Sequence, residues 1–335
     1  MTTASGEGDR VSPRIVIFGA GAVGSVVAAR LAQAGKPFHL VARGDRLDRL
    51  RVDGLLLRNG DGDTLRYDVA TAAPWEGTPQ DIVFLALKGQ AIPAALPDLG
   101  TWIGPDTVVV PLVNGIPWWY FQPHGTRSVG AVDPQAHVSA AIDPHHVVGA
   151  VLYLTASLAR NGVASMQGRE HIVMGPIAAW DDAVTEQLRT LFDGTPISID
   201  LVPDIRRDMW SKVALNIATN PLSVVADATL HDQFHDEGLA RLVANVLGEV
   251  IGLARAYQVE PRLSLEQMLA KGRQAGHVYT SMAQDYANGL PLELGAIAHS
   301  VLELADHVGF DMANTRMMVD LCTFRAAQQA RVSAI

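Results

Sequence analysis

The strongest pattern of apolar and polar positions lies close to the N-terminus. Residues 15–18 form a short apolar run, and residues 22–34 place small and apolar side chains at helical spacing up to Gly35. Between them stands GAGAVG, with the G-x-G-x-x-G spacing of a turn whose backbone N–H groups approach a pyrophosphate. Strand, glycine turn and helix in this order predict a dinucleotide site formed by Gly19, Ala20, Gly21, Ala22, Val23 and Gly24.

Further apolar runs indicate a parallel sheet. Residues 37–42 predict the second strand, and residues 81–87 and 107–113 are nearly continuous in apolar side chains, as in strands covered on both faces. The turn signal NGDGD, between residues 54–58 and 64–69, predicts a hairpin. The first half of the chain is therefore expected to be α/β.

Alternating and helical patterns follow in turn. We expect three antiparallel strands, then a surface helix over residues 181–192 and a last strand over 197–202. The three strands are predicted over residues 147–157, 163–167 and 171–174. From about residue 204 the periodicity is helical. We expect a disordered tail over residues 1–12, a Rossmann-type NADP-binding domain over 13–203 and an all-helical substrate and catalytic domain over 204–335.

Composition narrows the function classes. The 335 residues are 48% hydrophobic and 18% charged, as expected for a folded chain with a large core. The net charge of −9 argues against partners bound through phosphates, such as nucleic acid, and against an anionic membrane surface. The single cysteine, Cys322, fits a reducing compartment, and no apolar run approaches the ~20 residues of a membrane span. We expect a cytoplasmic protein that acts on a small molecule.

Polar residues follow the predicted strands. Arg43 follows the second strand, where an acidic residue would bind the ribose of NAD, and its guanidinium favours the 2′-phosphate of NADP. Lys88 and Asn114 follow the next two strands, at the edge where parallel sheets bind ligands. The alternatives are a solvated arginine, a loop lysine and an ordinary Asn-Gly turn.

Directly after Asn114 comes the aromatic run Trp118-Trp119-Tyr120-Phe121. It suits either a wall of the ligand cleft or a domain or dimer interface, with the interface slightly favoured. The loop region over residues 122–146 contains four histidines without metal-ligand spacing, so we expect no metal site.

The helix that opens the second domain has a polar stripe. Lys212, Asn216 and Asn220 are spaced i, i+4, i+8, and Thr219 lies beside them among apolar neighbours. A cleft with a polar ligand would satisfy these groups, and a buried lysine of lowered pKa could donate a proton. The alternative is a lysine that extends to water, with asparagines that cap neighbouring elements.

Later segments offer fewer signals. Residues 277–286 contain Ser281, and Pro291 and Glu293 are expected inside the first turn of the following helix, where the carboxylate could simply serve the helix dipole. An apolar stripe is expected to form either domain core or a homodimer contact. Its members are Val243, Leu247, Val250 and Leu253.

At these residues the chain resembles the ketopantoate reductases (2-dehydropantoate 2-reductases). The resemblance rests on GAGAVG, on Arg43-Gly44, on Leu87-Lys88 and on Val113-Asn114-Gly115. It rests also on MWSKVALNIATNPLSVV over residues 209–225, on TSMAQD over 280–285 and on Glu293. The K-x-x-x-N-x-x-x-N-P block is the most specific of these motifs.

The resemblance implies a role for each matching residue. Lys212 would protonate the substrate carbonyl as hydride arrives from NADPH, and Glu293 would hold substrate or ribose. Asn114 would touch both ribose and substrate, and Lys88 would lie beside the cofactor. Asn216, Asn220 and Ser281 would orient the hydroxyl and carboxylate groups of the substrate.

Some positions depart from the family pattern. The family commonly has E-I-D-Y-(I/L)-N-G after the glutamate, whereas Gly295 and Ala298 stand here among apolar residues. Val278 replaces a frequent asparagine. The motifs and the resemblance together lead us to expect an NADPH-dependent reductase of a small 2-oxo acid, with 2-dehydropantoate as the first candidate. The alternatives are a reductase of another ketone, 2-oxo acid or imine, and a non-catalytic NADP-binding sensor.

Overall fold

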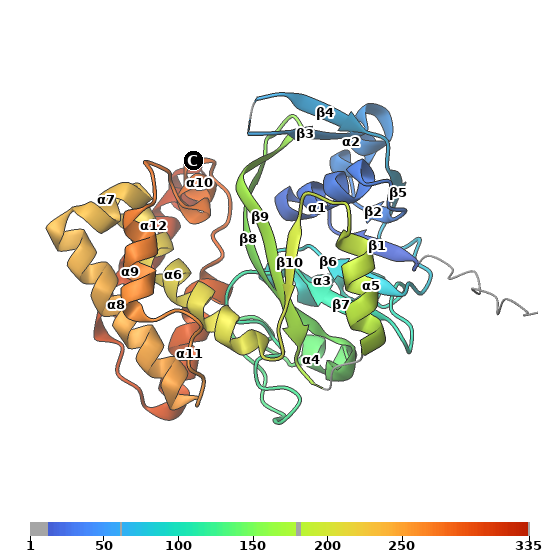
Figure 1. Cartoon of the computed structure of the whole chain (residues 1–335). Coiled ribbons are helices and arrows are strands. Elements are labelled where there is room, and N and C mark those ends of the chain that lie inside the picture. Colours follow the sequence, from blue (N-terminus) through green and yellow to red (C-terminus); the bar gives the residue numbers. More distant parts are fainter. Residues whose placement is uncertain (1–12, 61, 179–181, 334–335) are drawn as a thin grey trace, which may run out of the picture.

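The computed structural model describes residues 13–60, 62–178 and 182–333, so the predicted tail over residues 1–12 lies outside the described residues. Figure 1 shows an α/β part, coloured from blue through green to the yellow of its last strand, beside a helical part, yellow to red, with the long strands β8 and β9 near their boundary. The last strand of the α/β part ends at Leu201, and the first helix of the helical part begins at Ile205. We accordingly propose residues 13–203 and 204–335 as the two domains.

A five-stranded parallel sheet forms the first layer, in the order β5-β2-β1-β6-β7. Its strands are β1 (Ile15–Phe18), β2 (His39–Val41), β5 (Ala70–Ala72), β6 (Ile82–Leu85) and β7 (Val108–Pro111). The residues of β1, β6 and β7 are all buried, which explains their continuous apolar runs. Its helices and turns are α1 (Ala22–Gln33), α2 (Asp45–Asp53), η1 (Gly89–Ala91), α3 (Ile92–Leu99), α4 (His137–Ala141) and η2 (Pro144–His146).

A second, mixed sheet covers α1. It contains β3 (Leu55–Arg58), β4 (Thr64–Tyr67), β8 (Val148–Leu158), β9 (Ala164–Pro176) and β10 (Ser198–Leu201), with α5 (Asp182–Phe192) before the last strand. The predicted hairpin is confirmed, because β3 and β4 pair antiparallel. The predicted break between residues 167 and 171 is wrong: β9 runs through it, and Gly168 at φ +76° lies at an irregularity in the pairing with β8. β10 pairs parallel to β9.

The remaining described chain is helical. Its elements are α6 (Ile205–Ala226), α7 (Leu230–His235), α8 (Glu237–Ala256), α9 (Leu265–Arg273), α10 (Ser281–Ala287), the π-helical η3 (Gly295–His299), α11 (Ser300–Val308) and α12 (Ala313–Ser333). Pro291 and Glu293 lie directly before the helical run that contains η3, and not inside its first turn as predicted. The carbonyl of Glu293 accepts the first helical bond, from the Ile297 N–H, so its carboxylate lies at the very start of the π-helix.

Aromatic side chains join the two parts. Tyr120 is buried and packs edge-on against Trp210 of α6 and Tyr257 at the end of α8, and its hydroxyl accepts a hydrogen bond from the Trp210 indole at 3.2 Å. Trp118 and Trp119 are also buried. The aromatic run is therefore interdomain core, as the favoured alternative predicted.

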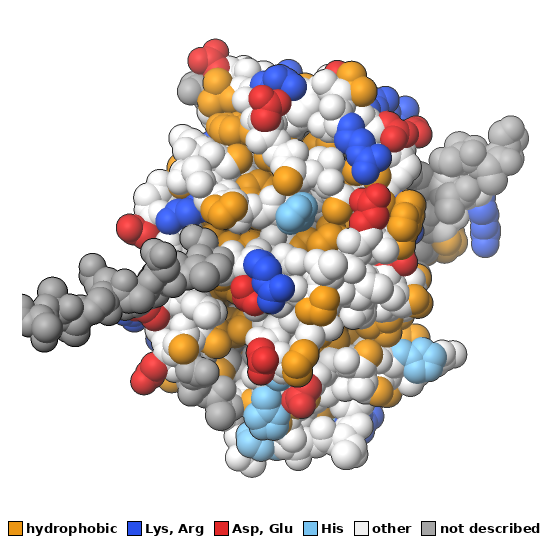
Figure 2. All heavy atoms as spheres, turned by 90° about the vertical axis from the view of Figure 1, so that its right-hand side faces the viewer, with side chains coloured by type: hydrophobic (Ala, Val, Ile, Leu, Met, Phe, Trp, Pro, Cys, Tyr) orange, Lys and Arg blue, Asp and Glu red, His pale blue; other side chains and the backbone are white. Residues whose placement is uncertain are grey.

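The apolar stripe of α8 is core as well, because Val243, Leu247, Val250 and Leu253 are fully buried. In the described part of the chain, none of the helices is long and apolar enough to cross a membrane. On the face shown in Figure 2, positive and negative side chains are interspersed among hydrophobic ones.

Candidate active site

A cavity of about 520 Å³ lies at the carboxyl ends of β1, β6 and β7, where parallel sheets bind ligands. Both domains line it. The first contributes the glycine loop, Arg43, Lys88 and Asn114, and the helical domain contributes Ser281, Asp285 and Glu293. The structure thus brings together the predicted cofactor residues other than Gly24, and with them two predicted substrate-side residues, Asn114 and Ser281, which lie far apart in the chain.

The three glycines have different surroundings. Gly19 has φ +118°, and a Cβ there would lie 2.6 Å from the Ala86 carbonyl oxygen. A Cβ at Gly24 would lie 1.9 Å from the Gly19 carbonyl oxygen, so only glycine permits this contact of helix and strand. At Gly21 the nearest atom would be 4.0 Å away. Gly21 is exposed at the cavity, which leaves room for a ligand to approach the backbone.

The start of α1 is free to bind an anion. The helix begins at Ala22, so the N–H groups of its first turn have no partner within the helix, and among the described residues no side chain caps it. These donors and the helix dipole face the same cavity. The glycine loop and the first turn of α1 therefore fit the pyrophosphate of a dinucleotide.

Arg43 and Arg46 line the cavity beside the glycine loop, and they differ in the hydrogen bonds that their side chains make. Arg46 donates to the carbonyl oxygens of Ala20 and Gly162 and to the Ser25 hydroxyl, so its guanidinium holds the glycine loop in place. Arg43 is exposed and makes no side-chain hydrogen bond or ion pair with the described residues. Arg43 is therefore the guanidinium available to a ligand.

Two contacts cross the cavity between the domains. The Lys88 ammonium donates to the Asp285 carboxylate at 2.8 Å and to the Pro291 carbonyl at 3.3 Å. The Asn114 side chain lies close enough to the Glu293 carboxylate to affect the pKa of that group. Burial, together with the negative charge of Asp285, raises the pKa of Glu293, whereas Lys88 and Asn114 oppose the rise. Asp285 thus lies in the site, although the sequence analysis assigned it no role beyond its place in the TSMAQD motif.

Main-chain contacts fix Asn114 against Glu293. Gly115 has φ +84°, and a Cβ there would lie 2.0 Å from the Ala296 carbonyl oxygen. The next residue, Ile116, donates its N–H to that same oxygen at 2.8 Å. The loop after β7 therefore packs directly on the π-helix that follows Glu293.

Lys212 lies on α6, outside the lining of this cavity. Its ammonium stands 5.3 Å from the centroid of the Tyr153 ring, and the Lys271 ammonium of α9 stands 5.0 Å from the same centroid. Burial, with the positive charge of Lys271, lowers the pKa of Lys212 to about 8. Tyr153 precedes the cavity-lining Ala156 by three residues, about 10 Å along an extended strand.

Lys271 and Tyr153 are further residues that the sequence analysis missed. Neither belongs to a motif, and only the folded chain brings α9, β8 and α6 together. Within the described residues, the ammonium groups of Lys212 and Lys271 have no acidic partner.

The rest of the polar stripe divides into two kinds. The Thr219 hydroxyl donates to the Leu215 carbonyl of its own helix at 2.7 Å, so it is already satisfied. Asn220 is buried and Asn216 half-buried, and neither side chain hydrogen-bonds to another described residue. Both amides are therefore available to a ligand.

The departures from the family pattern have visible packing roles at two positions. Ala298 is fully buried, and a Cβ at Gly295 would lie 3.0 Å from the Ala131 carbonyl oxygen. Larger polar side chains would not fit there without rearrangement. Val278 differs, because it is 48% exposed and its backbone carbonyl accepts from the Leu230 N–H.

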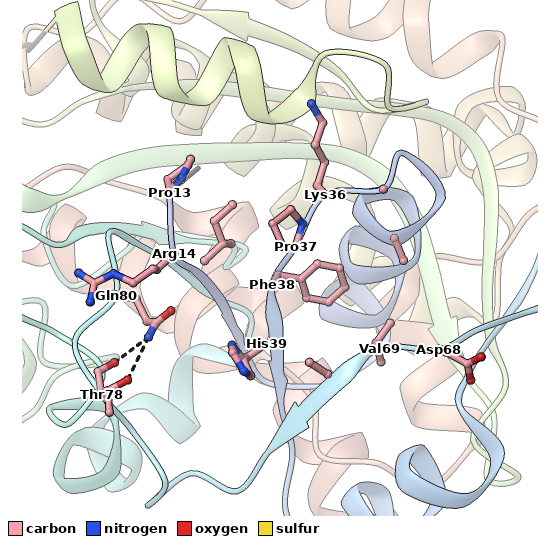
Figure 3. Close-up of a pocket in the computed structure, with 14 residues that line it drawn as sticks. Pro13, Arg14, Lys36, Pro37, Phe38, His39, Asp68, Val69, Thr78 and Gln80 are labelled. Atoms are coloured by element: carbon pink, nitrogen blue, oxygen red, sulfur yellow. Dashed lines mark hydrogen bonds between the residues drawn. The ribbon is translucent and has the colours of Figure 1, made fainter. Parts of the chain in front are cut away.

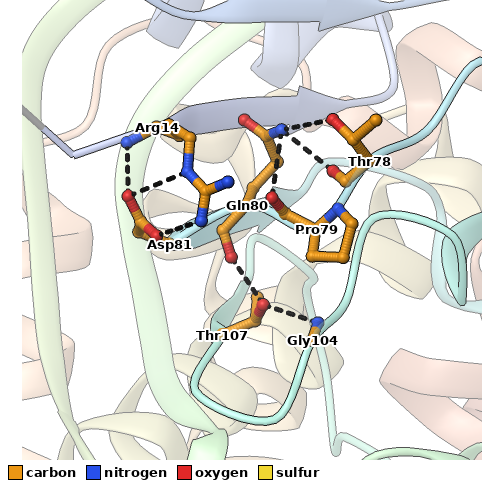
Figure 4. A network of polar contacts seen from close by, with 7 residues as sticks. All are labelled: Arg14, Thr78, Pro79, Gln80, Asp81, Gly104 and Thr107. Carbon is orange, nitrogen blue, oxygen red and sulfur yellow. Dashed lines mark hydrogen bonds and ion pairs between the residues drawn. The ribbon is translucent and has the colours of Figure 1, made fainter.

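A larger hollow, of about 710 Å³, lies at the opposite edge of the parallel sheet (Figure 3). Several of its polar groups already have partners in the protein. Arg14 pairs with Asp81 at 2.8 Å, the Gln80 amide donates to Thr78, and the Gln80 carbonyl accepts from the Thr107 hydroxyl (Figure 4). Because this edge carries the amino ends of β1 and β2, we assign function to the cavity at the carboxyl ends.

Comparison with known proteins agrees with this geometry. The family models "Ketopantoate reductase PanE/ApbA" and "Ketopantoate reductase PanE/ApbA C terminal" match residues 15–179 and 204–326. The 2-dehydropantoate 2-reductase of Mesorhizobium japonicum is 31% identical over 298 residues, which are 87% of this chain and 91% of the relative. The enzyme of the same name from Nostoc sp. is 26% identical over 309 residues, 89% of this chain and 91% of the relative.

Solved structures show the same fold. A protein of Ralstonia solanacearum MolK2, provisionally assigned as a ketopantoate reductase, has a TM-score of 0.89 at 31% identity, over 96% of this chain and 99% of the other. A D-mandelate dehydrogenase has a TM-score of 0.83 at 18% identity, over 95% and 99%, which shows the fold alone. The chain belongs to the ketopantoate reductase family and is an oxidoreductase acting on a CH–OH group.

Proposed function

We propose that this enzyme reduces a small 2-oxo acid to the 2-hydroxy acid with NADPH, and that 2-dehydropantoate, giving pantoate, is the first substrate to test. One observation carries the proposal. The glycine loop, Lys88, Asn114, Ser281 and Glu293 meet in one cavity between the domains. The name of the Mesorhizobium japonicum relative supports the choice of substrate.

The cofactor proposal rests on the fit of the glycine loop and Arg43. The first turn of α1 would hold the pyrophosphate, and the unpartnered Arg43 would bind a 2′-phosphate, which favours NADPH over NADH. Lys88 and Asn114 would hold the nicotinamide half. Bound NADPH supplies the hydride.

The proton would come from Lys212. With its pKa near 8, the ammonium is still protonated at neutral pH and releases a proton more readily than an exposed lysine. The free amides of Asn216 and Asn220, with the Ser281 hydroxyl, would orient the substrate. Glu293, beside Asn114, would accept a hydrogen bond from substrate or ribose.

The substrate class follows from charge. Lys212 and Lys271 place two ammonium groups over one ring without an acidic partner in the described chain, an arrangement that favours an anion. A 2-oxo acid brings a carboxylate together with the carbonyl that accepts hydride. We propose that Lys271 binds this carboxylate, while Lys212 donates its proton to the carbonyl oxygen.

The second candidate is a reductase of another ketone, 2-oxo acid or imine. The exposed Val278 motivates it, because an apolar side chain stands where the family often has an asparagine. A panel of 2-oxo acids, neutral ketones and imines, followed by loss of NADPH absorbance, distinguishes the candidates. The first candidate requires the highest kcat/KM for 2-dehydropantoate by a wide margin. A neutral ketone as the best substrate would contradict it.

We also propose a homodimer and a cytoplasmic location. Met317, Leu321 and Phe324 are 68%, 51% and 59% exposed and follow one another at i, i+4, i+7 on α12, an apolar face suited to a second copy. The buried Cys322 is a free thiol, as a reducing compartment would leave it.

A further inference from the structure

A cluster of histidines lies on the helical domain, away from the residues that line the cavity. His231 and His277 stack face to face with ring centroids 3.9 Å apart, and His235 stacks on the other side of His231 at 4.0 Å. Asp232 stands beside them. One ligand atom from each of His231, Asp232 and His277 can be chosen so that all lie within 4.8 Å of one another.

The two rings present equivalent atoms to one oxygen. Nδ1 of His231 lies 3.8 Å and Nδ1 of His277 lies 3.9 Å from Oδ1 of Asp232. These separations are too long for hydrogen bonds. They are also longer than the roughly 3.4 Å between tetrahedral zinc ligands, and the two rings are stacked, so the rings must turn slightly for both Nδ1 atoms to reach one ion about 2 Å away. Nδ1 of His231 is buried and has no hydrogen-bond partner in the described chain, a costly state for a polar atom.

The carboxylate is already oriented for such a role. Its other oxygen, Oδ2, accepts from the Thr229 N–H at 2.9 Å and from the Thr229 hydroxyl at 2.6 Å, as part of the capping box of α7. Oδ1 therefore points at the two imidazoles with a fixed geometry. Held ligands of this kind are typical of metal sites.

We propose that His231, Asp232 and His277 bind one divalent transition-metal ion, with Zn²⁺ as the best match. Two imidazole nitrogens and a carboxylate oxygen are ligands that Zn²⁺ takes, and water would complete a tetrahedral set. The expectation of no metal site came from residues 122–146 alone. The sequence signal was the H-x-x-x-H spacing of His231 and His235, although the fold uses His277 as the second imidazole.

The ion would hold residues 276–278, which precede the cavity-lining helix α10, against α7. The backbone N–H groups of Leu230 and His231 already donate to the carbonyls of Val278 and Gly276, which places residues 276–278 against α7. Thr280 then caps α10, and α10 carries Ser281 and Asp285 to the cavity. The proposed ion would therefore stabilise the fold, and its binding does not depend on which substrate the enzyme uses.

The test is zinc binding to the chelator-treated full chain by titration calorimetry, with the thermal midpoint as a second readout. We expect one Zn²⁺ per chain with Kd on the order of micromolar or tighter, and a higher midpoint at saturation. His277→Ala should weaken binding by roughly 100-fold and abolish the zinc-induced rise. His277 is 70% exposed, so the variant should fold, which its circular dichroism checks.

A matched control separates the cluster from ordinary surface histidines. His145 is 65% exposed and also stands beside an aspartate, Asp143, at 3.0 Å. His145→Ala should bind zinc as the unchanged chain does. Absence of a one-to-one site, wild-type affinity in His277→Ala, or an equal loss in His145→Ala would each overturn the proposal.

Discussion

Lys212 and Lys271 place their ammonium groups 5.3 and 5.0 Å from the centre of one ring, that of Tyr153, although they belong to different helices. Two like charges at one ring favour loss of a proton from the more buried member, and the pKa of Lys212 is lowered to about 8, by burial first and by Lys271 second. In the proposed mechanism, this pair would link proton donation by Lys212 to binding of the substrate carboxylate by Lys271.

The first prediction concerns Lys212 itself. Lys212→Ala removes the proposed proton donor, so kcat should fall by roughly 10²–10⁴, the usual contribution of general acid catalysis. Steady-state kinetics with NADPH measure this, and the thermal midpoint verifies folding. Near-normal turnover in the variant would exclude Lys212 as the donor.

The second prediction concerns pH. The proposed mechanism needs Lys212 in its protonated form, so kcat/KM should be flat below pH 8 and fall about tenfold per pH unit above it. Lys271→Gln removes the second cause of the lowered pKa, so the fall should begin at higher pH, and KM for an anionic substrate should rise. An unmoved profile would show that Lys271 does not act on Lys212.

The third prediction concerns cofactor choice. Arg43→Ala removes the guanidinium proposed for the 2′-phosphate, so the ratio of kcat/KM for NADPH over NADH should fall by about tenfold or more. Arg43 is exposed and without protein partners in the described chain, so stability should not change. Arg46→Ala is the contrasting variant, because its three hydrogen bonds hold the loop and its loss should weaken both cofactors.

The fourth prediction uses two glycines of one loop. Gly21→Ala meets no protein atom within ordinary contact, so the chain should keep its thermal midpoint but lose dinucleotide affinity. Gly24→Ala places a Cβ 1.9 Å from the Gly19 carbonyl oxygen and should lower the midpoint strongly. Calorimetric unfolding and fluorescence titration with NADPH measure the two effects. Equal destabilisation in both variants would refute the division of roles.

The fifth prediction concerns assembly. Phe324→Glu on the exposed face of α12 should convert a homodimer to a monomer, because it puts a charge into an apolar contact. Light scattering after size-exclusion chromatography gives the mass. Val52→Glu is a suitable control, since Val52 is 77% exposed on α2 of the other domain. A monomeric parent chain would contradict the dimer.

Local sequence was sufficient where one short segment forms one structure. The glycine loop and the apolar runs of β1, β6 and β7 were predicted because their patterns depend on turn geometry and two-sided burial. The break in β9 was predicted wrongly, because Gly168 looks in sequence like a turn and occurs in the fold as an irregularity within one strand.

Sequence was insufficient where a side chain's role depends on distant partners. Glu293 was expected in the first turn of an ordinary helix, but the helix after it is π-helical and packs its Ala296 on Gly115. Lys271 carried no local signal, since its effect arises only beside Lys212. The role of the aromatic run depended on Trp210 and Tyr257, which lie about 90 and 140 residues away in the chain.

The main-chain bond from the Ile116 N–H to the Ala296 carbonyl has a mechanical consequence. It joins the loop of Asn114 to the turn of Glu293, so we expect these two residues to stay together when the domains move. The exposed ion pair of Lys88 and Asp285, by contrast, can separate in water at little cost. If the two domains open, the Ile116 contact is therefore the expected pivot, and the ion pair of Lys88 and Asp285 is the contact expected to separate.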